Sequence, residues 1–187
     1  MIRTKEDYRH YLAADKKNYW MPKGGLRKRL LYAESWFIHE YLETLRRLEY
    51  LTNIRRNPLQ QLFYAYTLYK YKKLVFKLKV SIPVNVAGPG LRILHLGIIR
   101  VHKNSRIGSN CTFQPGVFVG QKDKDENVPT IGDNVYFGPG AKVFGKVRIG
   151  NNVVIAPNSV VIKDVPDNCV VSGVPAKIIK QNGVKVP

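Results

Sequence analysis

The chain has 187 residues, 44% of them hydrophobic, and two cysteines, which fits one large or two small domains without a disulfide framework. No apolar run approaches the roughly 20 residues that span a bilayer. The charged stretch 1–7 lacks the apolar core of a signal peptide, so we expect a cytoplasmic protein. The net charge of +18 favours an anionic partner. The sequence contains no zinc-finger spacing or RNP-like aromatic run, so we expect no nucleic-acid partner.

Residues 1–80 are predicted to form an α-helical domain. Thr4 and Asp7 form a capping-box pattern at the start of the first helix. Asn57 and Pro58 suit the N-cap and first position of the last helix. Breaks at 20–25 and near 54–57 separate three predicted helices, over residues 3–17, 26–51 and 58–77.

The third predicted helix combines aromatic residues with lysines, among them Phe63, Tyr64, Tyr66, Tyr69, Tyr71, Lys70, Lys72, Lys73 and Lys77. Aromatic rings and lysines suit the interface of an anionic membrane. Packing of the rings on neighbouring helices or subunits explains the same composition. The sequence leaves both interpretations open, so peripheral membrane contact is one expectation.

From Val101 to Val161 an apolar residue recurs at every sixth position, and Asp125 alone interrupts the series: Val101, Ile107, Phe113, Val119, Ile131, Phe137, Val143, Ile149, Ile155 and Val161. A period of six predicts a β-helix of hexapeptide repeats in which these residues point inward. Residues two positions earlier, such as Cys111, should also be buried. Glycines at 108, 120, 132, 138 and 150 are expected where the chain turns.

The polar stretch around 121–129 falls where one repeat is missing. The six-residue register resumes at Ile131, so this stretch replaces a repeat without shifting the rest. We expect a loop extruded from a β-helix domain that spans 81–187. Such loops often carry function, although a tolerated insertion explains the stretch equally well.

Two motifs indicate a family. They are IPVNVAGPGLRILHLG at 82–97, and IGNNVVIAPNSVVIKDVPDNCVVSGVPAKIIK at 149–180, which contains GVPAK at 173–177. Through them the chain resembles left-handed β-helix acetyltransferases of the serine acetyltransferase type, and within these the capsular and exopolysaccharide O-acetyltransferases. The resemblance implies an α+β chain with a left-handed parallel β-helix and acyltransferase activity. It further implies acetyl-CoA as cosubstrate, no metal, and a homotrimer with active sites between neighbouring β-helices.

The chain has four histidines that could act as a base. His95 lies in the motif that matches the catalytic histidine of the family, and it is predicted to be the general base. His102 is the second candidate, while His10 and His39 fall in predicted helices. Asn85 either orients His95 or caps a turn.

The resemblance also indicates where coenzyme A binds. Backbone amides near Gly145 are expected to stabilise the oxyanion, and lysines near the end suit phosphate. The predicted acetyl-CoA contacts are Pro139, Ala141, Gly145, Pro157, Lys163, Lys177 and Lys180.

Two departures from the serine acetyltransferase pattern bear on the acceptor. Leu94 stands where that group has an Asp directly before the histidine, and no Arg-His pair precedes Pro129. These departures predict a glycan acceptor: a hydroxyl of a sugar or cell-surface polysaccharide, acetylated at the inner face of the membrane. The alternatives are an L-serine O-acetyltransferase of cysteine biosynthesis and a non-catalytic hexapeptide-repeat binding protein.

Overall fold

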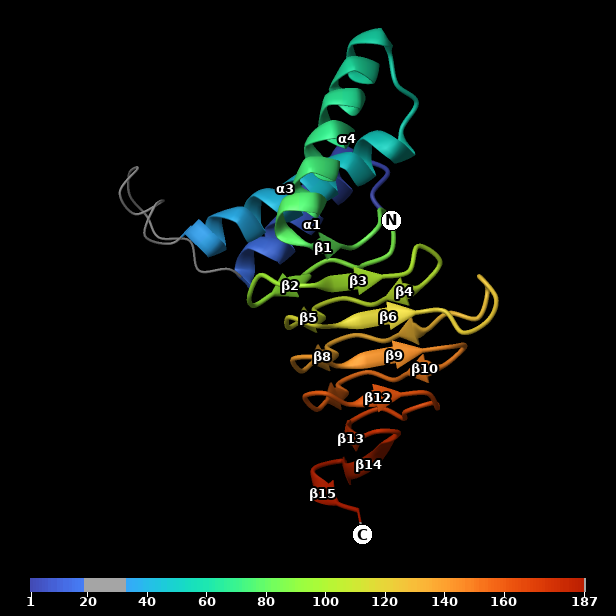
Figure 1. Ribbon diagram of the computed structural model, residues 1–187. Coiled ribbons are helices and arrows are strands. Elements are labelled where there is room, and N and C mark those ends of the chain that lie inside the picture. The colour runs from blue at the N-terminus through green and yellow to red at the C-terminus, as the bar shows by residue number, and fades with distance from the viewer. Residues whose placement is uncertain (19–32, 187) are drawn as a thin grey trace.

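The computed structural model describes residues 1–18 and 33–186, and it consists of a helical segment stacked on one end of a β-helix (Figure 1). Helix α1 (Lys5–Lys17) starts with the predicted capping box, in which Thr4 Oγ1 accepts from the Asp7 N–H at 3.0 Å. Helix α3 (Ala33–Asn53) overlaps the second predicted range, 26–51, and ends two residues beyond it. Residues 26–32 of that range and the predicted break at 20–25 are outside the described residues.

Helix α4 (Pro58–Leu78) confirms the third predicted helix. The Asn57 side chain accepts from the Gln60 N–H at 2.8 Å, and the Gln60 side chain accepts from the Asn57 N–H at 3.0 Å. The helix ends at Lys79, whose φ of 60° is left-handed. Within the described residues, no helix is long and apolar enough to cross a membrane.

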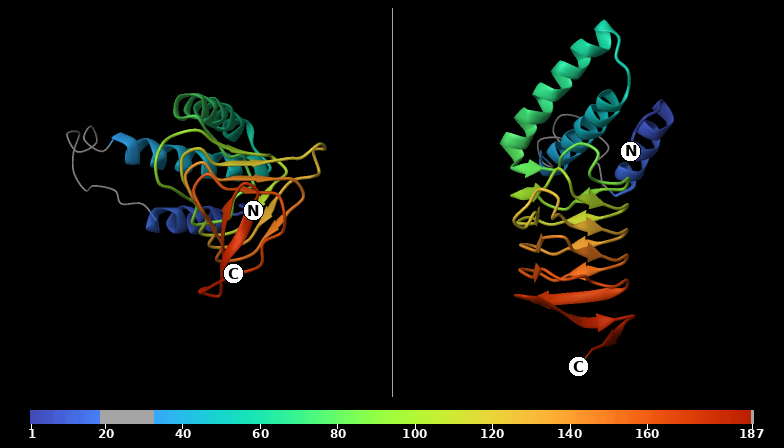
Figure 2. Two further views of the ribbon diagram at one scale, coloured as in Figure 1. Left: turned by 60° about the horizontal axis from the view of Figure 1, so that its bottom comes forward. Right: turned by 90° about the vertical axis from the view of Figure 1, so that its right-hand side faces the viewer.

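The strands form three parallel sheets that wind as the sides of one coil (Figures 1 and 2). Sheet A contains β1 (Val80–Ser81), β3 (Ile99–Val101), β6 (Phe118–Gly120), β9 (Lys142–Phe144) and β12 (Val160–Val161). Sheet B contains β4 (Arg106–Ile107), β7 (Thr130–Ile131) and β10 (Arg148–Ile149). Sheet C contains β2 (Arg92–Ile93), β5 (Thr112–Phe113), β8 (Tyr136–Phe137), β11 (Val154–Ile155), β13 (Cys169–Gly173), and antiparallel β14 (Ala176–Gln181) and β15 (Val184–Lys185).

The hexapeptide prediction is confirmed at each position of the series. Every inward residue from Val101 to Val161 is buried, and so is Cys111. Phe113 and Phe137 stack in the core with ring centroids 4.6 Å apart. Full burial of such a side chain contributes about 1.5–3 kcal/mol, so the column of inward residues is the main source of the stability of the coil.

The extruded loop is also confirmed. Val101 pairs with Val119, 18 residues on, whereas Val119 pairs with Val143, 24 residues on. The additional six residues lie between β6 and β7, in the segment that projects from the coil in Figure 1. Residues 122–126 of this loop are exposed.

The predicted role of the glycines needs correction, because none of the five at 108, 120, 132, 138 and 150 is among the residues with positive φ. A Cβ on each would lie within 2.7 Å of an atom in the next coil. They permit close stacking of the coils. The left-handed turns of the edge at 108, 132 and 150 are made by asparagines with φ of 56–57°: Asn110, Asn134, Asn152 and Asn168.

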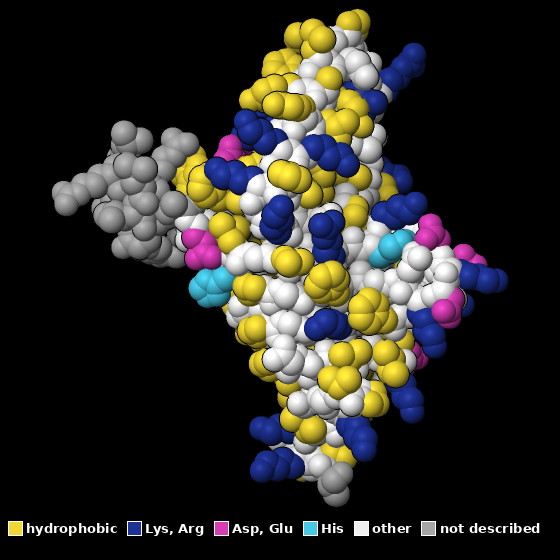
Figure 3. Space-filling view, in the orientation of Figure 1, with side chains coloured by type: hydrophobic (Ala, Val, Ile, Leu, Met, Phe, Trp, Pro, Cys, Tyr) yellow, Lys and Arg dark blue, Asp and Glu magenta, His cyan; other side chains and the backbone are white. Residues whose placement is uncertain are grey.

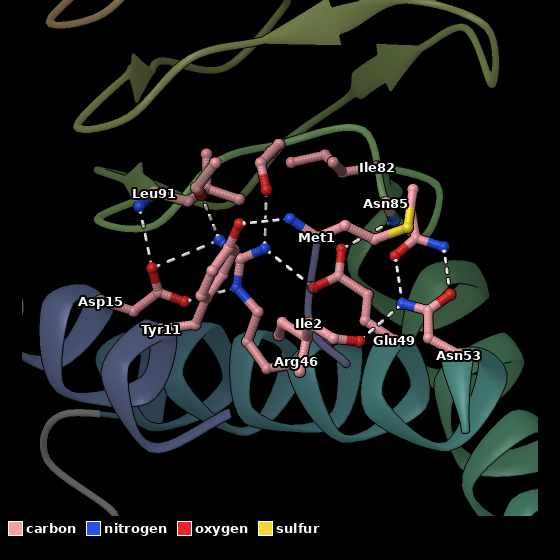
Figure 4. A network of polar contacts seen from close by, with 12 residues as sticks. Met1, Ile2, Tyr11, Asp15, Arg46, Glu49, Asn53, Ile82, Asn85 and Leu91 are labelled. Atoms are coloured by element: carbon pink, nitrogen blue, oxygen red, sulfur yellow. Dashed lines mark hydrogen bonds and ion pairs between the residues drawn. The ribbon is translucent and has the colours of Figure 1, made fainter. Parts of the chain in front are cut away.

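A buried polar network joins the helices to the first coil (Figure 4). The Arg46 side chain of α3 is fully buried; it donates to Asp15 at 2.8 Å, to Glu49 at 2.9 Å and to the carbonyl oxygens of Ala87 and Gly88 at 2.9 and 2.6 Å. Burial by itself would lower the Arg46 pKa, but Glu49 and Asp15 raise it above its ordinary value. One hydrophobic cluster also runs from α3 through the coils, so the helices are held firmly above the first coil.

Candidate active site

His95 lies on the turn between β2 and β3, at the end of the β-helix that adjoins the helices. Its side chain is 65% exposed, and the preceding residue is anchored because the Leu94 N–H donates to the Phe113 carbonyl oxygen at 3.0 Å. Gly97 completes the turn. A Cβ there would approach the Pro115 Cβ to 2.8 Å, so only glycine fits without a shift of the next coil. The turn therefore holds the His95 backbone in place and leaves its ring accessible.

A carboxylate from a distant part of the sequence faces His95. Glu34, in the first turn of α3, places Oε2 at 3.4 Å from His95 Nδ1 and accepts the Leu96 N–H at 2.6 Å through Oε1. A carboxylate at Nδ1 favours the neutral tautomer with its proton on that nitrogen, which leaves Nε2 as a proton acceptor. The 61-residue separation explains why the sequence analysis missed this pair.

Asn85 does not orient His95. The Asn85 and Asn53 side-chain amides bond to each other in both directions, at 2.7 and 2.9 Å, and the Asn85 N–H donates to Glu49 at 2.8 Å (Figure 4). Asn85 also has a φ of 63°, which is typical of a turn residue. It thus belongs to the join between helices and coil, as the alternative turn-cap interpretation expected.

His102, the second candidate, lies at another corner, beside the extruded loop. Its Nε2 is 3.8 Å from Asp125 of the loop, and its Nδ1 accepts the Asn104 N–H at 3.3 Å. The side chain is only 19% exposed. Of the other histidines, His10 is exposed on α1, and His39 lies 4.0 Å from Glu43 on α3.

The corner that carries His95 recurs in each coil and forms a continuous edge, here called the histidine edge (turns 94–98, 114–117, 138–141 and 156–159). Successive turns are linked by N–H groups that donate to the coil before: Gly116 to Ile98, Gly140 to Pro115, and Asn158 to Pro139, each at 2.8 Å. Two predicted acetyl-CoA contacts, Pro139 and Pro157, lie exposed on this edge. His95 stands at its helical end.

Other predicted contacts lie elsewhere or are already engaged. The Ala141 side chain is fully buried, and its N–H donates to Gly138. Gly145 is buried, and its N–H donates to the Gly120 carbonyl oxygen at 3.2 Å, so this amide is not a free oxyanion donor. Burial and existing hydrogen bonds therefore argue against both residues as direct contacts through their side chain or N–H.

Gly145 and the exposed Lys163 lie at the corner between sheets A and B, here called the loop edge (turns 102–105, 120–129, 144–147 and 162–164). Lys177 and Lys180 are exposed on β14, beyond the last complete coil. The predicted contacts are thus divided between two edges and the C-terminal hairpin. Among the described residues, no group of three or more His, Cys, Asp or Glu side chains could hold a metal ion.

The fold is a left-handed parallel β-helix with an exposed histidine on one edge, and part of it is similar to the hexapeptide repeats of bacterial transferases. The family model described as bacterial transferase hexapeptide (six repeats) matches residues 129–163. That match covers β7 to β12, where the repeat is most regular.

The individual proteins to which the chain is similar are serine acetyltransferases. The enzyme from Synechococcus elongatus is 39% identical over 102 residues, which are 53% of this chain and 41% of that protein. The enzyme from Staphylococcus xylosus is 38% identical over 136 residues, 65% of this chain and 62% of that one. The solved serine acetyltransferase of Brucella abortus has a TM-score of 0.73 at 26% identity, over 96% of this chain and 71% of that chain. The chain spans about half the length of the curated relatives that it matches.

These comparisons correct the predicted acceptor. The relatives and solved structures described above are serine acetyltransferases, and none supports closeness to polysaccharide O-acetyltransferases. The prediction of a glycan acceptor was therefore wrong. It rested on two departures, Leu94 in place of an Asp before the histidine and the missing Arg-His pair before Pro129. The fold brings a carboxylate to this histidine from Glu34.

Proposed function

We propose that this chain is an acetyl-CoA-dependent O-acetyltransferase whose acceptor is the hydroxyl of L-serine. The observation that carries the proposal is the Glu34–His95 pair at the head of the histidine edge, with Nδ1 and the carboxylate 3.4 Å apart. Similarity to serine acetyltransferases supports the choice of acceptor and of acyl donor. Both cysteines are buried free thiols, which agrees with a reducing, cytoplasmic compartment.

In the proposed mechanism His95 acts as a general base. Its Nε2 takes the hydroxyl proton as the serine oxygen attacks the thioester carbonyl, and the imidazolium then returns a proton to the departing thiolate. Glu34 stabilises the imidazolium and keeps the ring oriented. Since the Glu34 side chain is 47% exposed, the same carboxylate can also accept a hydrogen bond from the substrate ammonium. Glu34 thereby supplies the negative charge that an Asp would carry at the position of Leu94.

We further propose that the pantetheine arm of acetyl-CoA lies along the histidine edge, past Pro139 and Pro157. The phosphates would meet exposed lysines, among which Lys177 and Lys180 lie on β14 near the C-terminal end. Lys163 lies on the other edge of the same protomer and reaches this arm only from a neighbouring copy.

A cyclic homotrimer would bring the histidine edge of one copy to the loop edge of the next, because such rings join different surfaces. The outer face of sheet A, between the two edges, supports this arrangement. Phe118, Phe144 and Val160 are only partly buried there, and the nearby Ile98 and Ile162 are 51% and 49% exposed. An apolar face of this kind favours packing against another subunit.

The test is release of free coenzyme A thiol from acetyl-CoA by wild type, His95→Ala and His102→Ala. L-Serine is offered beside ethanolamine, which lacks the carboxylate, and 3-hydroxypropionate, which lacks the ammonium. We expect turnover with L-serine, a loss of about 10²–10⁴-fold in His95→Ala, and little change in His102→Ala. Equal turnover with and without serine, or equal activity of wild type and His95→Ala, would refute the proposal. Absence of turnover with all acceptors would favour a binding protein.

A further inference from the structure

Helix α4 buries one face and thereby fixes which face points outward. Its buried residues are Thr67, Tyr71, Leu74 and Leu78, spaced three or four apart. The Tyr71 hydroxyl donates to the Ile82 carbonyl oxygen at 2.7 Å, and its ring stacks on Tyr41 of α3 with centroids 5.9 Å apart. This side of α4 is therefore held against α3 and the first coil, and the helix cannot turn its other side inward.

The outward side of α4 carries a second apolar stripe. From position 59 to 69 large apolar side chains recur there every three or four residues, and another follows two turns later at 76. All are 57–77% exposed: Leu59, Leu62, Phe63, Tyr66, Tyr69 and Phe76. A helix that is apolar on an exposed face as well as on its buried face has an apolar surface available to a binding partner. Figure 3 shows hydrophobic side chains interspersed with those of Lys and Arg over the upper part of the molecule.

The charge of α4 itself has one sign, and Glu40, which lines the groove beside it, belongs to α3. Helix α4 contains no Asp or Glu, and it carries Lys70, Lys72, Lys73 and Lys77, followed by Lys79. Lys70 pairs with Glu40 of α3 at 2.8 Å, whereas Lys72 and Lys73 are exposed. Between α3 and α4 runs a groove of about 310 Å³, lined by Tyr66, Tyr69, Lys73 and their neighbours.

We propose that the outward face of α4 is a docking surface for an anionic lipid bilayer, on which the helix lies flat. Aromatic rings and leucines enter the headgroup region, while lysines meet lipid phosphates. The charge pattern argues against a second copy as the occupant. Two α4 helices facing each other would bring together two surfaces that both carry lysines, with no acidic residue on either helix to pair with them.

Helix α4 lies at the same end of the molecule as His95, and the turns with Pro139 and Pro157 lie further along the β-helix (Figure 1). Docking through α4 would therefore bring the His95 end of the acyltransferase to a membrane surface. This inference does not depend on the identity of the acceptor.

The test is co-sedimentation of the full chain with vesicles of phosphatidylcholine alone and with about 30% phosphatidylglycerol added. We expect partition at least about tenfold stronger to the anionic vesicles, and weaker at about 0.5 M salt. Lys72→Gln/Lys73→Gln should lower partition by about 30-fold, since each lysine contributes about fivefold at an anionic surface. Phe63→Ser/Phe76→Ser should lower it as well.

The matched control is Lys5→Gln/Arg9→Gln, which removes the same charge from exposed positions of α1 and should leave partition unchanged. Circular dichroism and solution acetyl-transfer assays verify that every variant is folded. Equal partition to neutral and anionic vesicles would overturn the proposal. A fall in oligomer mass in the α4 variants, with no effect on vesicle binding, would assign the face to another copy. Binding of duplex DNA that depends on Lys72 and Lys73, without vesicle binding, would also overturn it.

Discussion

Replacing Arg46 by Met should destabilise the fold strongly, although Arg46 lies outside the proposed active site. The substitution keeps the length of the apolar stem but removes the donors to Asp15, Glu49 and two backbone carbonyl groups. Removing one partner of a buried ion pair costs about 3–5 kcal/mol. In the variant Asp15 still accepts hydrogen bonds from the N–H groups of Gly90 and Leu91, at 2.8 and 2.9 Å, so its carboxylate is not left without partners. We therefore expect the free energy of unfolding to fall by about 4 kcal/mol, less than the sum of the costs for two isolated buried carboxylates.

Urea unfolding followed by circular dichroism measures this loss. The matched control is Arg47→Met, at the next position of α3, where the Arg47 side chain is 46% exposed and pairs with a partly exposed Glu43. An exposed pair contributes about 0.2–1 kcal/mol. If the two variants unfold within about 1 kcal/mol of each other, the argument that Arg46 anchors the helices on the first coil is wrong.

Three further substitutions and modifications test the site and the coil. Glu34→Gln should lower kcat with serine by about eightfold, since two charges at the 3.4 Å distance to His95 attract each other in water with about 1.2 kcal/mol. Glu6→Gln, at an exposed position of α1, serves as control, and an unchanged kcat in Glu34→Gln would remove Glu34 from the mechanism. Asn152→Ala should cost about 2 kcal/mol through left-handed strain, and Asn152→Gly should unfold at higher urea than the Ala variant. Burial raises the pKa of Cys111 from 9.0 to about 12, so native protein should resist iodoacetamide at pH 8 and unfolded protein should react. Rapid alkylation of the native protein would contradict the burial of Cys111. Because the Cys111 thiol ionises at lower pH in the unfolded state than in the folded state, the free energy of unfolding should also fall as pH rises from about 9 to 12.

Local sequence signals were sufficient to predict the helices and the coil of the β-helix. The capping residues Thr4 and Asn57 define helix starts because they act on N–H groups two or three positions away. The six-residue series predicts the coil because every inward residue meets its equivalent in the next coil, as Val101 meets Val119. The division into two domains stays a prediction.

Contacts between segments far apart in the chain could not be predicted from the sequence pattern. No periodicity connects Glu34 with His95, and their approach depends on how α3 is seated on the first coil by Arg46. The separation of Lys163 from Pro139 onto different edges follows from the winding of the strands, which motif similarity does not express.

The sequence by itself determined the β-helix and the place of its loop, because these depend on short repeats and local turns. The choice of His95 followed from the motif at 82–97 and stays a prediction. Only the tertiary structure decided which carboxylate faces that histidine and which face of α4 remains exposed. Both depend on the packing of α3 and α4 against each other and the first coil. Such packing joins residues far apart in the chain, and their spacing carries no periodic signal.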